Sequence, residues 1–298
     1  MSIIQQKSLI ALCAIAAAAC GAVSQAAAQP ASFVDDDGQT IRLAEPARRI
    51  VSLSPGATAM LFAVGAGSHV VGTASFSDEP EAARLVPRVG DSAGYDLERI
   101  VALRPDLIVA WGTGTNAAAL EQLRRSAIPI YSHHVAKLSD IPDAMRRLGQ
   151  IAGTPVSASI AADTLATRIN ALRTAPFAGA PRTVLIQVWD RPVYTVGGTQ
   201  LLSDAVGYCG YRNAYADLKD AAPAVTIESV LARNPAVIIA VAPDAKQANE
   251  WLARWRQLST LRAVRERRLL ALTDQRFSRL GPAVVEASEQ LCRQLNAK

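Results

Sequence analysis

Apolar and polar positions fall into blocks that predict an α/β fold. Short runs rich in β-branched and aliphatic residues, such as residues 49–53 and 182–188, have the length and composition of buried strands. Longer segments carry apolar residues at helical spacing, and the Ser-Pro-Gly sequence at residues 54–56 ends the first strand and begins a helix. Strands that alternate with helices in this way imply mainly parallel sheets.

One pattern occurs twice along the chain at a constant offset of 130 residues. Residues 98–110 read ERIVALRPDLIVA, and residues 228–240 read ESVLARNPAVIIA. Each copy predicts a short helix, a proline that ends it and an apolar strand. The offset is too long for a solenoid repeat, so it indicates two similar α/β lobes.

The segment between the two copies predicts the link between the lobes. Apolar residues at helical spacing over residues 138–175 are interrupted by Gly153-Thr154-Pro155, where Thr154 and Pro155 can serve as N-cap and first residue of a second helix. We therefore expect an N-terminal α/β lobe with a leading hairpin over residues 29–152. A connector helix over 153–177 and a C-terminal α/β lobe over 178–298 complete the predicted organisation.

The first 28 residues have the pattern of a secretory signal peptide. Lys7 precedes a short apolar, alanine-rich run, and Ala26-Ala27-Ala28 supplies the small residues of a cleavage site. The run is short for a membrane span, although a retained N-terminal anchor stays an alternative. A lipoprotein signal at Cys20 is a second alternative, but the leucine expected in such a signal is missing. The pattern thus predicts export to the periplasm.

Composition excludes some classes of protein. Half of the 298 residues are hydrophobic and only 19% are charged, which excludes a disordered chain. The net charge of +5 is mild for this length, and we interpret the arginine-rich segment at 254–268 as a solvated helix face, so no nucleic-acid partner is expected. After cleavage two cysteines remain, Cys209 and Cys292. Export favours a disulfide between them, with two buried thiols as the alternative.

Motifs for catalysis or metal binding are weak. The run from Gly112 to Ala117 fits a dinucleotide fingerprint, yet the next predicted strand ends in Ser132-His133-His134 and offers no acidic residue to hold a ribose. We interpret the run as a flexible loop that lines a ligand crevice, and an exported dinucleotide-dependent enzyme is kept as a remote alternative. Adjacent histidines cannot chelate like an i, i+4 pair on a helix, so no metal site and no cofactor are predicted.

Two carboxylates occupy matching places in the repeat. Glu98 and Glu228 each lie near a predicted helix start, behind Asp96 and Thr226 as N-caps. One interpretation is that each carboxylate complements a helix dipole. The other is that the chain displays one carboxylate per lobe to a partner with matching symmetry.

At these residues the chain resembles a known family, the class III periplasmic binding proteins of ABC importers for cobalamin, haem and iron chelates. The resemblance covers residues 49–295 and rests on the motifs RIVSLSPGAT, SFSDEP, DLERIVALRPDLIVAW, VLARNPAVIIA and a final EQLC. It implies two α/β lobes joined by one rigid helix, with the ligand held in the cleft between them. It also implies a monomer without enzymatic activity that delivers its ligand to a permease and ATPase complex in the inner membrane.

The resemblance is strongest to members that bind cobalamin, and it assigns roles to single residues. A corrinoid is the implied ligand, with haem or a ferric siderophore as the alternative. The implied docking residues are Glu98 and Glu228, and the implied disulfide joins Cys209 and Cys292. The ligand-binding positions that carry over are Gly56, Phe76, Trp111, Tyr194 and Arg279. Positions that depart from the pattern are Ser92, Ala222, Gln275 and Arg276, and candidate iron ligands are Tyr95, His133 and His134.

Overall fold

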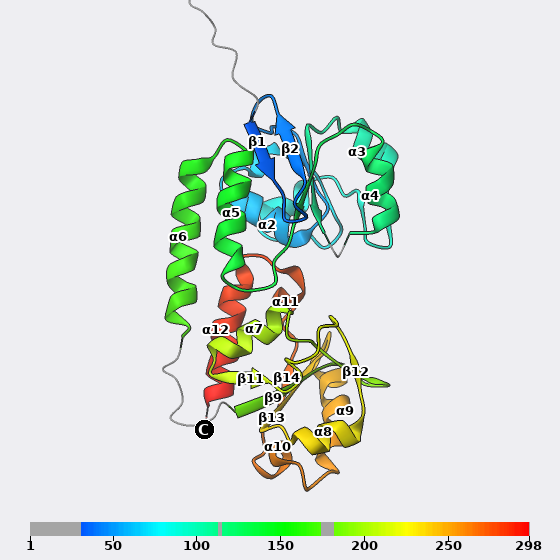
Figure 1. Cartoon of the computed structure of the whole chain (residues 1–298), viewed down its shortest axis with the longest axis vertical. Helices are drawn as coiled ribbons and strands as arrows, with labels where there is room; N and C mark the ends of the chain where they lie inside the picture. The colour runs from blue at the N-terminus through cyan, green and yellow to red at the C-terminus, as the bar shows by residue number, and fades with distance from the viewer. Residues whose placement is uncertain (1–30, 113–114, 174–181, 298) are drawn as a thin grey trace, which may run out of the picture.

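Two lobes stack along the long axis of the molecule in the computed structural model (Figure 1). The structure describes residues 31–112, 115–173 and 182–297. The predicted signal peptide lies outside these ranges, as do residues 113–114 of the glycine-rich loop and residues 174–177 of the predicted connector. Within these ranges, no helix has both the length and the apolar character that crossing a bilayer requires.

The N lobe is built on a four-stranded parallel sheet in the order β4-β3-β7-β8. Its strands are β3 (Ile50–Ser52), β4 (Val70–Thr73), β7 (Leu107–Trp111) and β8 (Ile130–His133). Two small antiparallel pairs accompany it, β1 (Ala31–Val34) with β2 (Thr40–Leu43), and β5 (Gly90–Asp91) with β6 (Gly94–Tyr95). The first of these pairs is the predicted leading hairpin.

Helices cover both faces of the N-lobe sheet. They are α2 (Pro55–Ala63), α3 (Leu97–Ala102), α4 (Ala117–Arg124) and α5 (Asp140–Ile151), with 3₁₀ turns at Gly67–His69 and Glu81–Leu85. Successive strand residues point to opposite faces, so Ile50 and Leu107 join the cluster that contains residues of α2 and α5, whereas Val51 and Ile108 join the one with α3 and α4. Both faces of the sheet are therefore buried, as expected for parallel strands.

The C lobe has a mixed sheet in the order β12-β10-β9-β13-β14, and β11 pairs with the first half of β9. Its strands are β9 (Arg182–Trp189), β10 (Val193–Thr195), β11 (Tyr211–Asn213), β12 (Ala224–Val225), β13 (Val237–Val241) and β14 (Leu269–Leu272). Strands β9, β11, β13 and β14 are parallel, whereas β10 and β12 are antiparallel additions at one edge.

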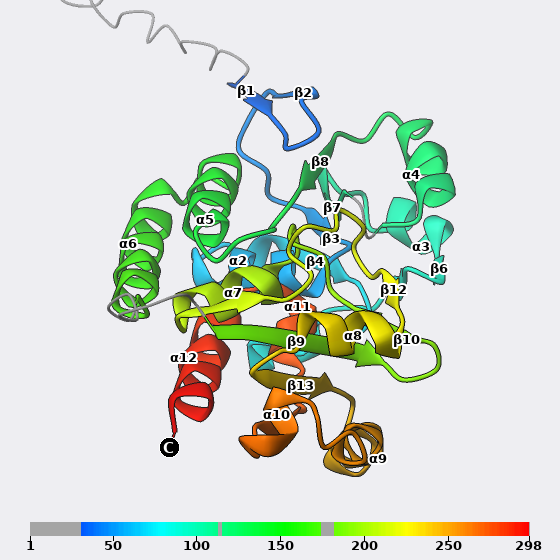
Figure 2. The same ribbon diagram turned by 60° about the horizontal axis from the view of Figure 1, so that its bottom comes forward.

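Helices also cover both faces of the C-lobe sheet. They are α7 (Leu201–Tyr208), α8 (Ile227–Arg233), α9 (Ala245–Arg256), α10 (Arg262–Arg265), α11 (Arg276–Arg279) and α12 (Ala283–Asn296). Figure 2 shows α9 and α10 on the side of this sheet that faces away from the N lobe. A disulfide joins Cys209, at the end of α7, to Cys292 on α12, with 4.8 Å between their Cα atoms. The pairing implied by the resemblance is confirmed.

Helix α6 (Pro155–Ala171) joins the two lobes. It packs along α5 of the N lobe (Figure 1). Its Arg168 makes an ion pair with Glu289 of α12, with 3.0 Å between Nε and Oε1. Pro155 begins the helix as predicted, but the hydroxyl of Thr154 makes no capping hydrogen bond. The expected fold class is confirmed: two α/β lobes with mainly parallel central sheets joined by one long helix.

One hydrophobic core crosses the boundary between the lobes. It runs from Met60 and Leu148 in the N lobe, through Leu165 of α6, to Leu201 and Val284 in the C lobe. The outer layers of each lobe form separate clusters. Because interiors are densely packed, a shared core couples the two lobes mechanically and opposes a wide hinge motion.

Candidate functional site

The loops that follow the parallel strands of both lobes meet at the lobe boundary. From the N lobe come the residues after β3 and β4, and from the C lobe those after β9, β13 and β14. In open α/β sheets this is where ligands bind, since the crevice lies outside the carboxyl ends of the strands. We call the residues of this junction the interlobe site.

The loop after β4 exposes the aromatic ring of Phe76 to solvent. Phe76 is 67% exposed, and its backbone is in the left-handed region with φ of 64°. A bulky residue rarely adopts this conformation, because its Cβ crowds the backbone. The neighbours fix it: the Ser75 amide donates to the carbonyl oxygen of Gly90 at 2.7 Å, and the buried Ser77 accepts from the Thr58 hydroxyl at 3.3 Å. The surrounding loop therefore imposes the exposed ring position.

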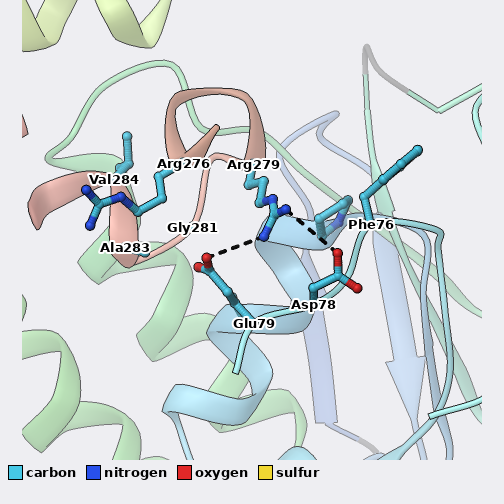
Figure 3. Close-up of a pocket in the computed structure, with 10 residues that line it drawn as sticks. Phe76, Asp78, Glu79, Arg276, Arg279, Gly281, Ala283 and Val284 are labelled. Carbon is cyan, nitrogen blue, oxygen red and sulfur yellow. Dashed lines mark hydrogen bonds and ion pairs between the residues drawn. The ribbon is translucent and has the colours of Figure 1, made fainter. Parts of the chain in front are cut away.

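An arginine of the C lobe reaches into this same loop. Arg279, at the end of α11, has a guanidinium nitrogen 3.3 Å from Glu79 Oε1 and another 3.7 Å from Asp78 Oδ2. Arg88 of the N lobe also pairs with Asp78, at 3.1 Å. Figure 3 shows the Arg279 side chain between the two carboxylates. Arg279 thus bridges the lobes at one small cavity, whose lining also includes Asp78, Glu79 and Phe76.

Gly56 allows the lobes to approach closely. It is the second residue of α2, and a β-carbon built on it would collide with the carbonyl oxygens of Arg279 and Leu280. Gly281 lies against the same helix near Ala59. Gly56, Phe76 and Arg279 are therefore brought together by the fold. The position of Gly56 is explained by lobe packing.

Trp111 lies at the carboxyl end of β7, next to β3 in the sheet, and it lines neither of the two cavities of the interlobe site. It is half-buried, and it is the register partner of His133 on β8. Its backbone amide donates to the Thr115 hydroxyl at 3.0 Å, and the Thr115 amide donates back to the Trp111 carbonyl oxygen at 2.7 Å. These two hydrogen bonds fold the described ends of the glycine-rich loop against the strand.

The three candidate iron ligands are all engaged or buried. The Tyr95 hydroxyl donates to the carbonyl oxygen of Leu53 at 3.1 Å, and His134 Nε2 lies 2.7 Å from Asp37 Oδ1. His133 is 1% exposed, and neither of its ring nitrogens has a hydrogen-bond partner among the described residues. Burial lowers the pKa of His133 to about 4, so its imidazole is neutral at pH 7. None of the three presents a free donor atom to the interlobe site.

The C-lobe half of the site is an apolar cavity of about 380 Å³. Its walls are strand ends and helix α7, with few polar side chains. The residues that form it include Val188, Trp189, Val196, Leu201, Leu202, Val241, Pro243, Trp251, Phe277 and Leu280. Tyr194 lies on β10 directly opposite Trp189 in an antiparallel pair, so both side chains lie on one face of the sheet.

The sequence prediction missed Trp189. This residue is 55% exposed and ends β9, one residue beyond the run 182–188 that the sequence predicted as a strand. A signal was available: Trp189 ends an apolar strand in the same way as Trp111, and a large aromatic residue at a strand's carboxyl end points to the ligand crevice.

Two of the four departing positions line the interlobe site: Gln275 lines the C-lobe cavity, and Arg276 lines the small cavity beside Phe76. Ser92 and Ala222 are small and exposed. Arg276 makes a paired interaction with Asp274 at 2.6 Å and a second one with Glu286 at 3.3 Å, and the Asp274 carboxylate raises the pKa of the guanidinium further above its ordinary value. Arg276 is therefore committed to its own lobe.

Glu98 and Glu228 occupy equivalent places in the two lobes. Helices α3 and α8 begin 130 residues apart and lead into β7 and β13, which are also offset by 130. The Asp96 side chain caps α3, and the Thr226 hydroxyl caps α8, as predicted. Both glutamates are exposed. A backbone amide and the Thr226 hydroxyl lower the pKa of Glu228, so this carboxylate is ionised at neutral pH.

Comparison with known proteins places this geometry in context. Residues 50–276 match the family model described as periplasmic binding protein. The chain is 32% identical over 252 residues to a vitamin B12-binding protein of Yersinia pestis, covering 85% of this chain and 88% of the relative. Among solved structures it is similar to the periplasmic vitamin B12 binding protein BtuF of Vibrio cholerae, with 32% identity, a TM-score of 0.74 and coverage of 84% and 97%.

A haem-binding structure also shares the fold. The periplasmic haem-binding protein RhuT of Roseiflexus sp. RS-1, in its apo form, is 25% identical with a TM-score of 0.69, covering 83% of this chain and 97% of that one. The two-lobe architecture is thus common to proteins with different named ligands.

Proposed function

The chain belongs to the periplasmic binding protein family, and from that membership we propose that it is the corrinoid-binding subunit of an ABC importer. The matched family and the named relatives are binding proteins, and this chain is a binding protein and not an enzyme. The observation that carries the corrinoid proposal is the exposed, conformationally constrained Phe76 at the lobe boundary, together with the largely apolar cavity in the C-lobe half of the junction. A broad ligand with apolar faces suits such walls.

The proposed ligand residues divide into two kinds. Phe76, Trp111 and Tyr194 supply aromatic surface, while Arg279 supplies a cation at the lobe junction. Gly56 keeps the N-terminus of α2 close to α11 and so sets the spacing of the lobes at the site.

The proposed cellular setting is the periplasm. The signal peptide predicted over residues 1–28 would be removed on export, leaving residues 29–298 as a monomer. The named relatives are periplasmic proteins, which supports this setting.

The proposed docking residues are Glu98 and Glu228. Each is exposed on a capped helix in a corresponding position of its lobe. Arginines on a two-fold symmetric permease would pair with them through charge-assisted hydrogen bonds, and the associated ATPase would drive release of the ligand.

Calorimetry on the mature chain tests the ligand. We expect cyanocobalamin to bind with a dissociation constant in the micromolar range or below, and hemin to bind at least tenfold more weakly. Tight hemin binding without cyanocobalamin binding would replace the corrinoid proposal with the haem alternative. Absence of binding to either would remove both.

Charge reversal tests the docking residues separately. Glu98→Lys with Glu228→Lys should abolish corrinoid uptake by cells that carry the importer while leaving calorimetric affinity unchanged. Glu45→Lys with Glu81→Lys makes the same change of charge at two other exposed sites and serves as the matched control. Normal uptake with the first pair contradicts the docking proposal.

A further inference from the structure

Trp189 is a large apolar side chain that the protein leaves in water. It is 55% exposed, whereas the other side chains of strand β9 from Val184 to Gln187 are buried. It borders the apolar C-lobe cavity together with Leu201 and Val241. Exposed aromatic surface at the rim of a concave apolar site is typical of a binding surface.

The position of Trp189 is fixed by buried neighbours. Its ring contacts Trp251 of α9, with 6.1 Å between centroids and 59° between planes, and Trp251 is 7% exposed. The buried Gln187 donates from Nε2 to the Trp189 carbonyl oxygen at 3.3 Å and accepts from the Trp255 indole at 2.7 Å. A strand end held in this way presents its last side chain in a defined place, which reduces the entropy lost on binding.

Tyr194 is the cross-strand neighbour of Trp189, although it does not itself line the cavity. It lies opposite Trp189 across the β9–β10 pair and is half-buried. The two rings therefore share one face of the sheet at its carboxyl end. Most of the other side chains that line the cavity are aliphatic or aromatic, and its polar lining residues are Gln200, Asp274, Gln275 and Ser278.

We propose that Trp189, with Tyr194 beside it, forms an aromatic wall of the ligand site and binds an apolar face or edge of a macrocyclic ligand by ring stacking. This inference deepens the proposed function and rests on it. The exposed indole supplies apolar area, and its N–H, which donates no hydrogen bond to the described residues, offers a donor to an acceptor group on the ligand. Trp189 is thus a specificity-determining residue of the C lobe.

Substitution measures the contribution of the wall. In calorimetry with cyanocobalamin, Trp189→Ala should weaken binding at least tenfold and Trp189→Phe by less than Trp189→Ala. Leu85→Ala removes an apolar side chain that is 88% exposed and outside the cavity, and it should leave affinity unchanged. Circular dichroism checks that each variant is folded. Affinity within twofold of wild type for both Trp189 variants would overturn the inference.

Protection of Trp189 from chemical oxidation tests ligand contact directly. If the role of Trp189 were only structural, ligand would not change its rate of oxidation. N-bromosuccinimide should oxidise Trp189 first in the free protein, as measured by peptide mass spectrometry, and saturating cyanocobalamin should slow that oxidation at least fivefold. The buried Trp255 is the internal reference. Equal oxidation of Trp189 with and without ligand contradicts the proposal that Trp189 forms a wall of the ligand site.

The two proposals fail in different ways. If wild-type protein binds no cyanocobalamin, the proposed function fails first, and the same variants are then assayed with hemin. If wild type binds and Trp189→Ala binds equally well, only the wall is lost. If Trp189→Ala keeps its affinity but loses uptake, Trp189 faces the permease and the wall is again refuted.

Discussion

The two lobes share one plan but present different chemistry to the site between them. The N-lobe wall is polar and hydrogen-bonded, with Asp78 and Glu79 paired to arginines and Ser77 buried behind them. The C-lobe wall is mostly apolar, with Trp189 and Val241 at the strand ends, and its charged groups are confined to α11 and the residues just before it. Because both lobes carry the same helix-to-strand unit at an offset of 130, the difference resides in the loops. Architecture and binding chemistry are therefore set by separate parts of the chain.

The lobes also differ in what stabilises them. A disulfide ties α7 to α12 in the C lobe, while the described part of the N lobe has no disulfide and buries a neutral histidine at the end of β8. Four changes test these differences, from the largest expected effect to the smallest.

Removing the disulfide should have the largest effect. The bond joins residues 83 apart, and chain entropy for a loop of that length corresponds to about 4–5 kcal/mol. We expect Cys209→Ala with Cys292→Ala to lower the free energy of unfolding by about that amount in urea titrations. Because one core crosses both lobes, the variant should still unfold in a single transition. Two transitions, with the N lobe surviving the first, would show that the lobes are independent.

Adding a methyl group at the lobe junction, in the variant Gly56→Ala, should have the second largest effect on stability. Gly56→Ala forces a β-carbon against the carbonyl oxygens of Arg279 and Leu280, and overpacking of this kind destabilises by about 1–3 kcal/mol. Gly207→Ala is the matched control, since a β-carbon at that helical position meets nothing within 4 Å. It should stabilise the protein by about 0.5–1 kcal/mol, because alanine favours helix more than glycine. Equal effects of the two substitutions would contradict the close approach.

Acid should destabilise the N lobe through His133. Its folded pKa of about 4 lies below the unfolded value of 6.5, so the stabilisation is present above pH 6.5 and is lost as the pH falls toward 4. Burial is the largest cause of the lowered pKa of His133; His134 and Arg147 lower it further, and Asp36 opposes them.

A variant isolates that histidine. Between pH 7 and 4.5, His133 should account for a loss of about 2 kcal/mol in the free energy of unfolding. His133→Gln has no imidazole to titrate. Between pH 7 and 4.5, the free energy of unfolding of this variant should therefore fall by about 2 kcal/mol less than that of wild type. Parallel pH dependence of wild type and variant would show that the imidazole is accessible to protons in the folded state.

The interlobe ion pair should have the smallest effect on stability. Arg279→Gln removes the partly exposed ion pairs with Glu79 and Asp78. We expect the free energy of unfolding to fall by less than about 1 kcal/mol. Its effect on cyanocobalamin affinity should exceed its effect on unfolding, if the cation also contacts the ligand. Arg124→Gln breaks a surface pair with Glu121 and should change neither. A loss of stability without any loss of affinity would make Arg279 a purely structural link.

Local patterns in the sequence were sufficient for most of the fold. The repeat correctly predicted α3 with β7 and α8 with β13, because a helix, a proline and an apolar strand each leave a periodic signal. The antiparallel β12 has two residues and β10 has three, too few for any periodicity. The shared core was also beyond prediction, since it depends on which helix faces meet after folding.

The site was predicted in part for similar reasons. Phe76 stood out as an aromatic residue in a polar loop, but its left-handed backbone depends on distant partners such as Thr58 and Gly90. Trp189 lies one residue beyond the predicted strand 182–188, and the strand pattern itself does not distinguish it from a core residue. Burial of His133 depends on helices packed over the sheet, and adjacent histidines in a sequence give no sign of it.

The continuous core has a consequence for how a transporter recognises a loaded carrier. When two halves of a protein share one packed interior, the filled and the empty molecule have nearly the same outline, and the spacing of Glu98 and Glu228 is nearly constant. Under the proposed function, occupancy is then reported by local chemistry at the mouth of the cleft, where the ligand would cover Phe76 and Trp189, and empty carrier would compete for the proposed docking surface.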